Sequence, residues 1–487
     1  MSDSAIDNKP GVPHQTVESR KLRNSLQPVG RLPEDLLVEV LMTVKSSSST
    51  EHPYVHHVYT ASQVCSRWRR ICINSPLLWA CIRIETFPLS PFVDLCITRA
   101  KGAPISLNVD PLRKKHKLTT NNWRHLVRSL ATRSVSTERW KALAIHVDSF
   151  EVFPDLLEHL VLHPTPNLES ISCATQTHKH LSELHPAHRS NTVSFSPSKS
   201  QLLSSSLPRL SSVELKRVHL AHLFDLKPPV LLNRLTRLHL VQSGVIHYTP
   251  DAFALLLSSY PNLQEVSLTE YPYSKDTDPA LWSTIPPIAF RTLCRLKLLV
   301  ADVYAVDGIG TPWILRFLQS IDAPRLQQLI IVSPPMLSNS PIEELVDFIS
   351  AGYTPNQLNA NETNPARKSL YPMLRYLSVR FNLPKDTRLH KAESMLAALP
   401  SLKYLSILGE DVTVVGNTPQ CSPCLTHLFI QSPAGPGQLK RVLHNRQEAG
   451  LPIRVLGVQE NTDVTELPCT VELKRYSPAR AISFLDF

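Results

Sequence analysis

The sequence predicts an α/β fold in which a short N-terminal helical unit precedes an irregular solenoid, with parallel strands on the concave face and helices outside. Three observations lead to this prediction. An apolar frame, L-x-x-L-x-L, recurs along most of the 487 residues, and amphipathic helical segments lie between its copies. Glycine is scarce, with 13 residues beside 41 prolines, which disfavours phosphate-binding loops and dinucleotide-binding folds.

The first element expected is a short amphipathic helix in LPEDLLVEVL, residues 32–41. Pro33 suits the first position of a helix, and the two acidic residues after it suit the positive N-terminal end. Leu36, Leu37 and Val40 then recur at three-to-four spacing along one face.

A second helical stretch follows in VHHVYTASQVCSRWRRICINS. The neighbouring arginines lie off an apolar stripe that recurs at helical spacing over Val55, Val58, Ala61, Val64 or Cys65, Trp68 and Ile71 or Cys72. Pro76 ends the helix, and Leu78 and Trp79 follow in an apolar cluster. Helices this short bury too little surface to fold alone, so they need a partner.

The order LP-x-x-L-L-x-x-V-L, V-C-S-R-W-R-x-I and S-P-L-L-W over residues 31–82 resembles the F-box motif. Its internal loop is longer than in compact F-boxes. The downstream segments CITRAKGAPISLNV and ERWKALAIHV are similar to those that join the F-box to C-terminal leucine-rich repeats in fungal-type F-box proteins, of the F-box-like domain family. The resemblance implies docking on the Skp-type linker subunit of a cullin-based ubiquitin ligase, while the repeats bind the protein to be ubiquitylated.

The resemblance also implies which side chains contact the linker subunit. By matched position they are Leu32, Pro33, Leu36, Leu37, Val40, Val64, Cys65, Trp68, Leu78 and Trp79. Apolar anchors at this spacing are typical of a helix that docks in a groove. The alternative is that these residues only cap the N-terminal end of the solenoid, because terminal repeats need a cap.

Eight copies of the apolar frame follow the helical unit. They are PRLSSVEL, NRLTRLHL, PNLQEVSL, RTLCRLKL, PRLQQLII, PMLRYLSV, PSLKYLSI and PCLTHLFI, which begin between residues 208 and 423. Their first leucines are separated by 23–33 residues, except for one interval of 48. This spacing is close to the leucine-rich-repeat period of about 20–29 residues. The x-L-x-L part alternates, which predicts a short strand with every second side chain buried.

Helices are expected between the strands, in DAFALLLSSY, TPWILRFLQS, IEELVDFISA and AESMLAALP. A strand and a helix cannot bury their apolar faces alone, so successive units stack into a solenoid. A generic α/β domain with parallel strands is the alternative fold. Polar or proline-rich stretches predict loops at residues 46–53, 173–206, 271–287 and 351–369.

The expected organisation has five parts. They are a disordered N-terminus over residues 1–28, an F-box over 29–84, a linking α/β segment with the first irregular repeats over 85–165, a leucine-rich-repeat solenoid over 166–460 and a C-terminal tail over 461–487.

Composition limits the compartment and the partners. The polar N-terminus and the absence of a long apolar stretch argue against secretion and membrane spanning. The 9 cysteines are scattered, which suits the cytoplasm and/or nucleus. A net charge of +10 modestly favours acidic partners or nucleic acid without identifying either. The densest basic run, RKKHK at residues 113–117, is typical of a solvated loop, and a nuclear-localisation or phosphate-binding patch is the alternative. Binding of nucleic acid is not expected.

The sequence shows no signature of catalysis. Cys421 and Cys424 have C-x-x-C spacing but lack the second ligand pair of a structural zinc site. G-x-S-x-G and H-E-x-x-H are absent. We therefore expect no metal, no cofactor and no enzymatic activity.

Basic and aromatic side chains near the repeat strands are candidates for binding a target protein. They are Arg237, Lys297, Arg375, Tyr376, Lys403, Tyr404 and His427. Positions between the frame leucines point away from the core, so these residues are expected on the concave face, where they suit an acidic or phosphorylated protein. An ordinary charged solvent face is the alternative.

Two functions therefore follow from the sequence. The first is a substrate-recognition adaptor of an SCF-type (Skp–cullin–F-box) ubiquitin ligase, and the second is a leucine-rich-repeat interaction scaffold without a role in ubiquitin transfer. An enzyme with an unrecognised site on the concave face is a third hypothesis.

Overall fold

The computed structural model describes most of the N-terminal helical unit and most of the repeat region. The described residues are 26–47, 55–111, 118–148, 152–175, 207–218, 234–241, 250–270, 288–300, 310–332, 339–351, 370–380, 385–408, 411–432, 434–460 and 471–476, with a few single positions near the two ends. The basic run at residues 113–117 lies outside them.

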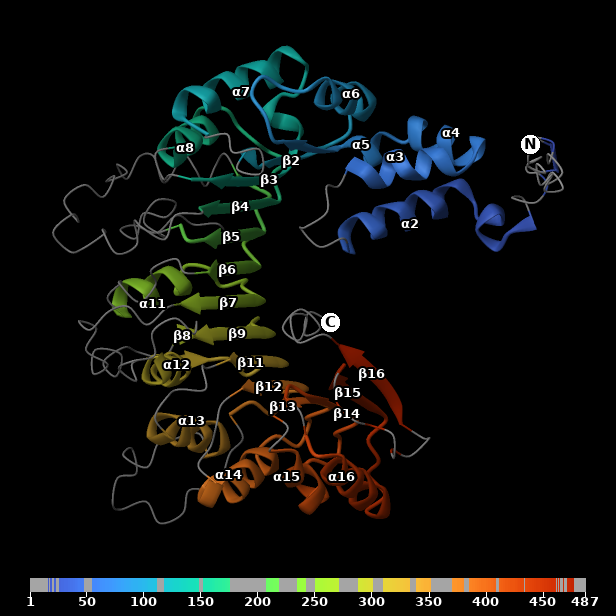
Figure 1. Ribbon diagram of the computed structural model, residues 1–487. Coiled ribbons are helices and arrows are strands. Elements are labelled where there is room, and N and C mark those ends of the chain that lie inside the picture. The colour runs from blue at the N-terminus through green and yellow to red at the C-terminus, as the bar shows by residue number, and fades with distance from the viewer. Residues whose placement is uncertain are drawn as a thin grey trace, which may run out of the picture.

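The N-terminal unit is helical. It consists of η1 (Pro28–Arg31), α2 (Glu34–Ser47), α3 (Val55–Val64), α4 (Ser66–Asn74) and α5 (Pro76–Trp79). In Figure 1, α2 lies beside α3 and α4, and α5 leads into the first strand. The first helix extends six residues beyond the segment from which it was predicted.

A single parallel sheet runs through the rest of the chain, and in the described residues it has 14 strands. The strands are β1 (Cys81–Ile84), β2 (Ile105–Val109), β3 (Trp140–Val147), β4 (Ser170–Thr175), β5 (Ser212–Lys216), β6 (Arg237–Val241), β7 (Glu265–Glu270), β9 (Arg295–Val300), β11 (Gln328–Val332), β12 (Tyr376–Arg380), β13 (Tyr404–Ile407), β14 (His427–Ile430), β15 (Val455–Gln459) and β16 (Glu472–Tyr476). They pair in chain order, as expected for stacked repeats.

Helices cover the outer side of this sheet. They are α6 (Pro91–Ala100), α7 (Thr120–Thr132), α8 (Val152–Leu162), α11 (Pro250–Ser258), α12 (Gly310–Gln319), α13 (Asn339–Ala351), α14 (Lys385–Ala397), α15 (Val412–Asn417) and α16 (Pro436–Glu448), with the short turns η3 (Thr137–Arg139) and η11 (Pro419–Cys421). A small second sheet pairs β8 (Ile288–Ala289) with β10 (Ile321–Asp322). Figure 1 shows an arc with the strands on its inner side and the helices outside.

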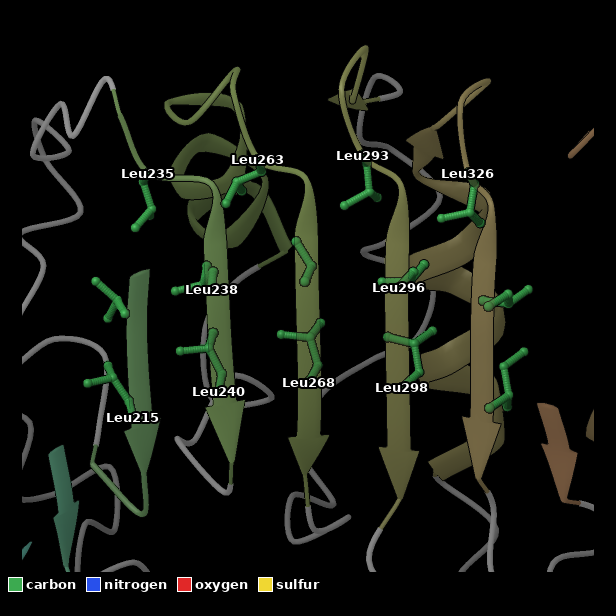
Figure 2. Packing of buried hydrophobic residues seen from close by; sticks show 14 of the residues in the cluster. Leu215, Leu235, Leu238, Leu240, Leu263, Leu268, Leu293, Leu296, Leu298 and Leu326 are labelled. Atoms are coloured by element: carbon green, nitrogen blue, oxygen red, sulfur yellow. The ribbon is translucent and has the colours of Figure 1, made fainter. Parts of the chain in front are cut away.

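The repeated leucines form the core between these two layers. Leu235, Leu238 and Leu240 are completely buried, and the equivalent leucines of the neighbouring strands lie beside them (Figure 2). Leu238 is in register with Val213 on β5 and Val266 on β7. Burial of one such leucine contributes about 1.5–3 kcal/mol. The repetition of this contact makes one continuous core and confirms the predicted α/β solenoid.

Backbone hydrogen bonds also join the turns that precede successive strands. The Arg375 N–H donates to the Gln327 carbonyl at 2.9 Å, and the Lys403 N–H donates to the Arg375 carbonyl at 2.8 Å. The Thr426 N–H continues the row by donating to the Lys403 carbonyl at 3.0 Å. Equivalent residues of adjacent repeats are therefore held one strand spacing apart, about 4.8 Å.

The sheet begins at Cys81, immediately after α5, and ends at Tyr476. It therefore includes strands in residues 85–165, where the first irregular repeats were expected, and one strand in the expected C-terminal tail. Strand β4 continues to Thr175, and the loop predicted from Cys173 therefore begins later. Residues 48–53, 176–206, 271–287 and 352–369, where loops were also predicted, lie outside the described residues.

A histidine lies among aromatic rings behind the first repeats. The ring of His159 on α8 is 6.2 Å from that of Trp123 and 5.9 Å from that of Trp140, measured between ring centroids. Burial, with a smaller contribution from His163, lowers the pKa of His159 to about 4. The folded protein therefore keeps His159 neutral at a pH where an unfolded histidine binds a proton.

We expect stability to fall as the pH decreases from about 6.5 to 4, because only the unfolded state gains a proton on His159 in this range. Partial solvent exposure screens the effect, so the expected loss between pH 7 and pH 5 is about 1 kcal/mol. Urea unfolding at the two pH values measures the loss. His159→Leu should reduce it, whereas replacing the exposed His125 with leucine should not. An unchanged loss in His159→Leu would contradict the assignment.

Candidate partner-docking surfaces

Helix α2 has one face in the core and another in solvent. Leu37 is 0% exposed, and Leu41 and Met42 pack against the core beside it. Leu36 and Val40, one helical turn apart, are 47% and 45% exposed. Apolar side chains on this outer face are available to a partner.

An arginine in the second half of the motif fixes the start of α2. The Arg67 guanidinium donates to the carbonyl oxygens of Gly30 and Leu32, and Arg70 forms an ion pair with Glu34 at 2.6 Å. The sequence pattern places these arginines off the apolar stripe and predicts no role for them. The signal lies in the motif itself, because Arg67 directly precedes Trp68 in the C-S-R-W-R segment.

The end of the helical unit is built into the solenoid core. Trp79 is buried, its indole N–H donates to the Cys72 carbonyl at 2.6 Å, and the Arg99 guanidinium on α6 lies 4.4 Å from its ring centroid. Leu78 is buried in the same core. The helical unit and the first repeats therefore share one hydrophobic core.

The residues expected to contact a linker subunit fall into three groups by exposure. The exposed ones are Pro33, Leu36, Val40 and Val64. The partly buried ones are Leu32, Cys65 and Trp68, and the Cys65 thiol caps α4 by accepting from the Trp68 N–H at 3.5 Å. The buried ones are Leu37, Leu78 and Trp79. The side chains of the buried group pack inside the protein, so they are not available to contact a partner.

Exposed apolar residues are concentrated in the helical unit. Of the 14 large hydrophobic residues that are exposed in the described part of the chain, seven lie between residues 29 and 85. These seven are Val29, Leu36, Val40, Tyr59, Val64, Ile73 and Leu77. Tyr59, Ile73 and Leu77 were not among the predicted contacts. The helical unit therefore offers more exposed apolar side chains to a partner than any other described part of similar length.

The middle of the concave face carries mixed charge. Arg237 is exposed, and Lys297 is partly buried. Between them, Glu265 accepts from His239 Nε2 at 3.1 Å and lies 4.0 Å from Arg295 Nη1. The hydrogen bond from His239, together with the charges of His239 and the nearby arginines, lowers the pKa of Glu265. Some of the positive charge here is therefore compensated within the protein.

The other five candidates lie together near the C-terminal end of the concave face. Tyr376, Tyr404 and His427 are the first residues of β12, β13 and β14 and occupy one register row. Ring centroids of Tyr376 and Tyr404 are 6.2 Å apart, and those of Tyr404 and His427 are 4.2 Å apart. Arg375 and Lys403 are exposed in the turns just before two of these strands.

Within the residues that the structure describes, no three histidine, cysteine or acidic side chains are grouped so that they could hold a metal ion. Cys421 is partly buried in η11 and Cys424 is exposed. No helix in the same residues is both long enough and apolar enough to cross a membrane.

Comparison with known proteins identifies the N-terminal region. The family described as F-box-like matches residues 29–85, and no curated protein matches the chain in sequence.

Several solved structures have a similar course of the chain at low identity. The leucine-rich-repeat-containing protein LegL7 from Legionella pneumophila has 12% identity and a TM-score of 0.38, with 80% of this chain and 100% of that chain covered. Rad7, in a yeast complex with Elc1, has 12% identity and a TM-score of 0.33, with 73% and 88% covered. A protein from Bacteroides fragilis has 10% identity and a TM-score of 0.34, with 72% and 83% covered.

The family match covers the same residues as the apolar helical unit. The repeated apolar frame lies in the strands of the parallel sheet that follows. Residues 29–85 therefore form an F-box-like domain, which is followed by an α/β solenoid of leucine-rich repeats.

Proposed function

We propose that this chain is a substrate-recognition adaptor of an SCF-type ubiquitin ligase, similar to the fungal-type F-box proteins. The F-box-like domain docks on a Skp-type linker subunit and through it on a cullin, and the solenoid binds the protein to be ubiquitylated. The proposal places the chain in the cytoplasm and/or nucleus, as its scattered cysteines suggest.

The observation that carries the proposal is the exposed apolar surface of the F-box-like domain. Leu36 and Val40 on α2, Val64 at the end of α3 and Leu77 on α5 expose apolar side chains to solvent. Burial of such side chains in a partner's groove would supply the binding energy, because a few desolvated apolar anchors usually dominate an interface.

The buried residues of the motif have a different role in this proposal. Leu78 and Trp79 fix the domain on the first repeats, and Leu37 is buried on the inner face of α2. A rigid junction suits an adaptor, because the bound target must be presented at a defined position relative to the linker subunit. The contribution to ubiquitin transfer is positional, through a raised local concentration of the target lysine, and it requires no catalytic side chain in this chain.

The test is a binding measurement between the full chain and a purified Skp-type linker protein. We expect a one-to-one complex with the wild-type chain. Leu36→Asp/Val40→Asp should weaken it by about 30-fold or more, because two apolar anchors become charged. The matched control is Leu162→Asp/Leu255→Asp, which changes two leucines on α8 and α11 that are at least 45% exposed and should leave the affinity within about twofold.

Circular dichroism of all variants establishes that they remain folded. Equal binding by Leu36→Asp/Val40→Asp and the wild-type chain would refute the assigned surface, and a folded wild-type chain that binds no linker protein would refute the adaptor function.

A leucine-rich-repeat scaffold without a ligase role is the second candidate. The shared core of Trp79, Leu78 and the first repeats favours it, because this is how a solenoid cap packs. The same measurement separates the two functions, since a cap has no affinity for the linker protein.

A further inference from the structure

One part of the concave face combines two features, a row of aromatic rings and a row of cations. We name it the aromatic–basic strip and define it by six residues, Arg375, Tyr376, Lys403, Tyr404, His427 and Arg454. The three rings belong to β12, β13 and β14, and the three cations lie in the turns before β12, β13 and β15, in the lower part of the arc in Figure 1.

The aromatic row is stacked on itself. The rings of Tyr404 and His427 are 4.2 Å apart and tilted by 37°, and the rings of Tyr376 and Tyr404 are 6.2 Å apart at 30°. The faces of the Tyr404 and His427 rings are directed at each other, which leaves their edges for a ligand to contact, whereas the Tyr376 hydroxyl is buried. Ring edges carry partial positive charge and attract oxygen anions, whereas ring faces attract cations and other flat rings.

The basic row runs along the turns directly beside the aromatic row. Arg375, Lys403, Thr426 and Arg454 follow one another in the ladder of backbone hydrogen bonds that joins the turns. The three cations of this row are exposed. In the described part of the chain none of them forms an ion pair with a carboxylate, and the Lys403 ammonium group lies 5.3 Å from the centroid of the Tyr404 ring.

The titration of His427 reports the same positive surroundings. Burial lowers the pKa of His427, and the charges of Lys403, Lys474 and Arg454 lower it further, against the single opposing charge of Glu472. Glu472 lies 3.7 Å from Lys474 at the far end of the row and bounds the strip on that side. The positive potential is therefore local, and Glu472 is the carboxylate that opposes it at His427.

Hydrogen bonds hold the neighbouring row of the sheet in a fixed arrangement. The Gln431 side-chain amide donates to the hydroxyl groups of Ser378 and Ser406 at 3.1 and 2.8 Å. On the next strands the Phe429 ring lies over Gly457, where a Cβ atom would come within 2.2 Å of the ring. A surface fixed in this way loses little conformational entropy when a ligand binds.

We propose that the aromatic–basic strip binds an extended acidic segment of a target protein, an inference that rests on the proposed target-binding role of the solenoid. Adjacent turns are about 4.8 Å apart, and every second side chain of an extended peptide is about 6.8 Å further along. Arg375 and Lys403 would share one carboxylate, and Arg454, two strands further on, would reach a second. The ring edges would contact the acidic side chains between these cations.

Single-stranded nucleic acid is the competing ligand for a basic and aromatic surface, because its bases stack on free ring faces. The faces of Tyr404 and His427 are directed at each other, which leaves little room for a base between them. An acidic side chain needs no free ring face, so the acidic peptide fits this arrangement of rings.

The test uses the full chain without a linker protein and a fluorescein-labelled peptide of alternating glutamate and serine, about 12 residues long so that it spans the strip. Fluorescence anisotropy at an ionic strength of about 0.05 M, where surface charges are weakly screened, gives the affinity. Arg375→Glu/Lys403→Glu should weaken binding by about tenfold or more. Tyr404→Leu should weaken it by about threefold, because an apolar side chain remains without the ring edge.

The matched control is Arg128→Glu/Arg441→Glu, which makes the same change in net charge at two exposed helical positions and should leave the affinity within about twofold. Equal binding by Arg375→Glu/Lys403→Glu and this control would overturn the proposal. So would the absence of peptide binding by the wild-type chain, or tighter binding of an oligothymidine than of the peptide. The readout is separate from linker binding, so each proposal can fail without the other.

Discussion

Replacing Arg446 with methionine is expected to lower the free energy of unfolding by about 3 kcal/mol. Arg446 lies on α16 and is completely buried. Its guanidinium group donates to the carbonyl oxygens of Leu425 and Leu451 at 3.2 and 3.0 Å, and also to the carbonyl and hydroxyl of Ser422 at 3.1 and 3.2 Å. Methionine occupies a similar space but offers no donor, so these buried acceptors lose their arginine partner.

The cost is large because neutral acceptors alone stabilise the arginine charge. Within the described residues no carboxylate forms an ion pair with Arg446, and burial lowers its pKa to about 10, so it still carries its proton at neutral pH. The planar fork of donors matches carbonyl groups that come from two separate turns. Lysine has the charge but not the fork, and Arg446→Lys should therefore destabilise the protein nearly as much.

Urea unfolding measures this change, and hydrogen exchange locates it, because loss of protection should be greatest over residues 411–460, which the arginine joins. The control is Arg441→Met on the same helix, where the side chain is exposed and the change should stay within about 0.5 kcal/mol. Equal effects of the two variants would mean that the hydrogen bonds of Arg446 contribute no net stability.

The repeat strands could be predicted because each copy of the frame is complete within a few residues. Leu238 and Leu240 alternate with polar residues, and this local pattern is enough to predict that both are buried. Strand β16 could not be predicted in this way. Its sequence, ELKRY, is mostly charged, and it joins the sheet because β15 offers an unpaired edge. The burial of Arg446 could not be predicted either, because its hydrogen-bond acceptors lie up to 27 residues away in the sequence.

The candidate docking surface was predicted as a set of residues but not as a surface. The apolar stripe of α2 is wide enough to include Leu36 and Leu37, which are consecutive and lie about 100° apart around the helix. Which of the two faces the core depends on where α3, α4 and α5 pack, and no local pattern contains that information. The same limit explains why Trp79 was expected at an interface and lies in the core.

Substitutions at Leu36 and Leu37 are expected to differ strongly in their effect on the free energy of unfolding. Leu37→Ala is expected to lower the free energy of unfolding of the F-box-like domain by about 3 kcal/mol, since it leaves a cavity at a completely buried position. Leu36→Ala removes the same atoms from a side chain that is 47% exposed and should cost less than about 0.5 kcal/mol. Urea unfolding of the two full-length variants compares them directly.

The order of effects should reverse when binding to a Skp-type linker protein is measured below the unfolding transition. Leu36→Ala should weaken the complex by several-fold, because an exposed anchor loses its contact area. Leu37→Ala should weaken it only by the fraction of molecules in which the domain has unfolded. Each leucine thus serves as the control for its neighbour. Weaker binding by Leu37→Ala in fully folded protein would place Leu37 in the interface, against the burial observed here.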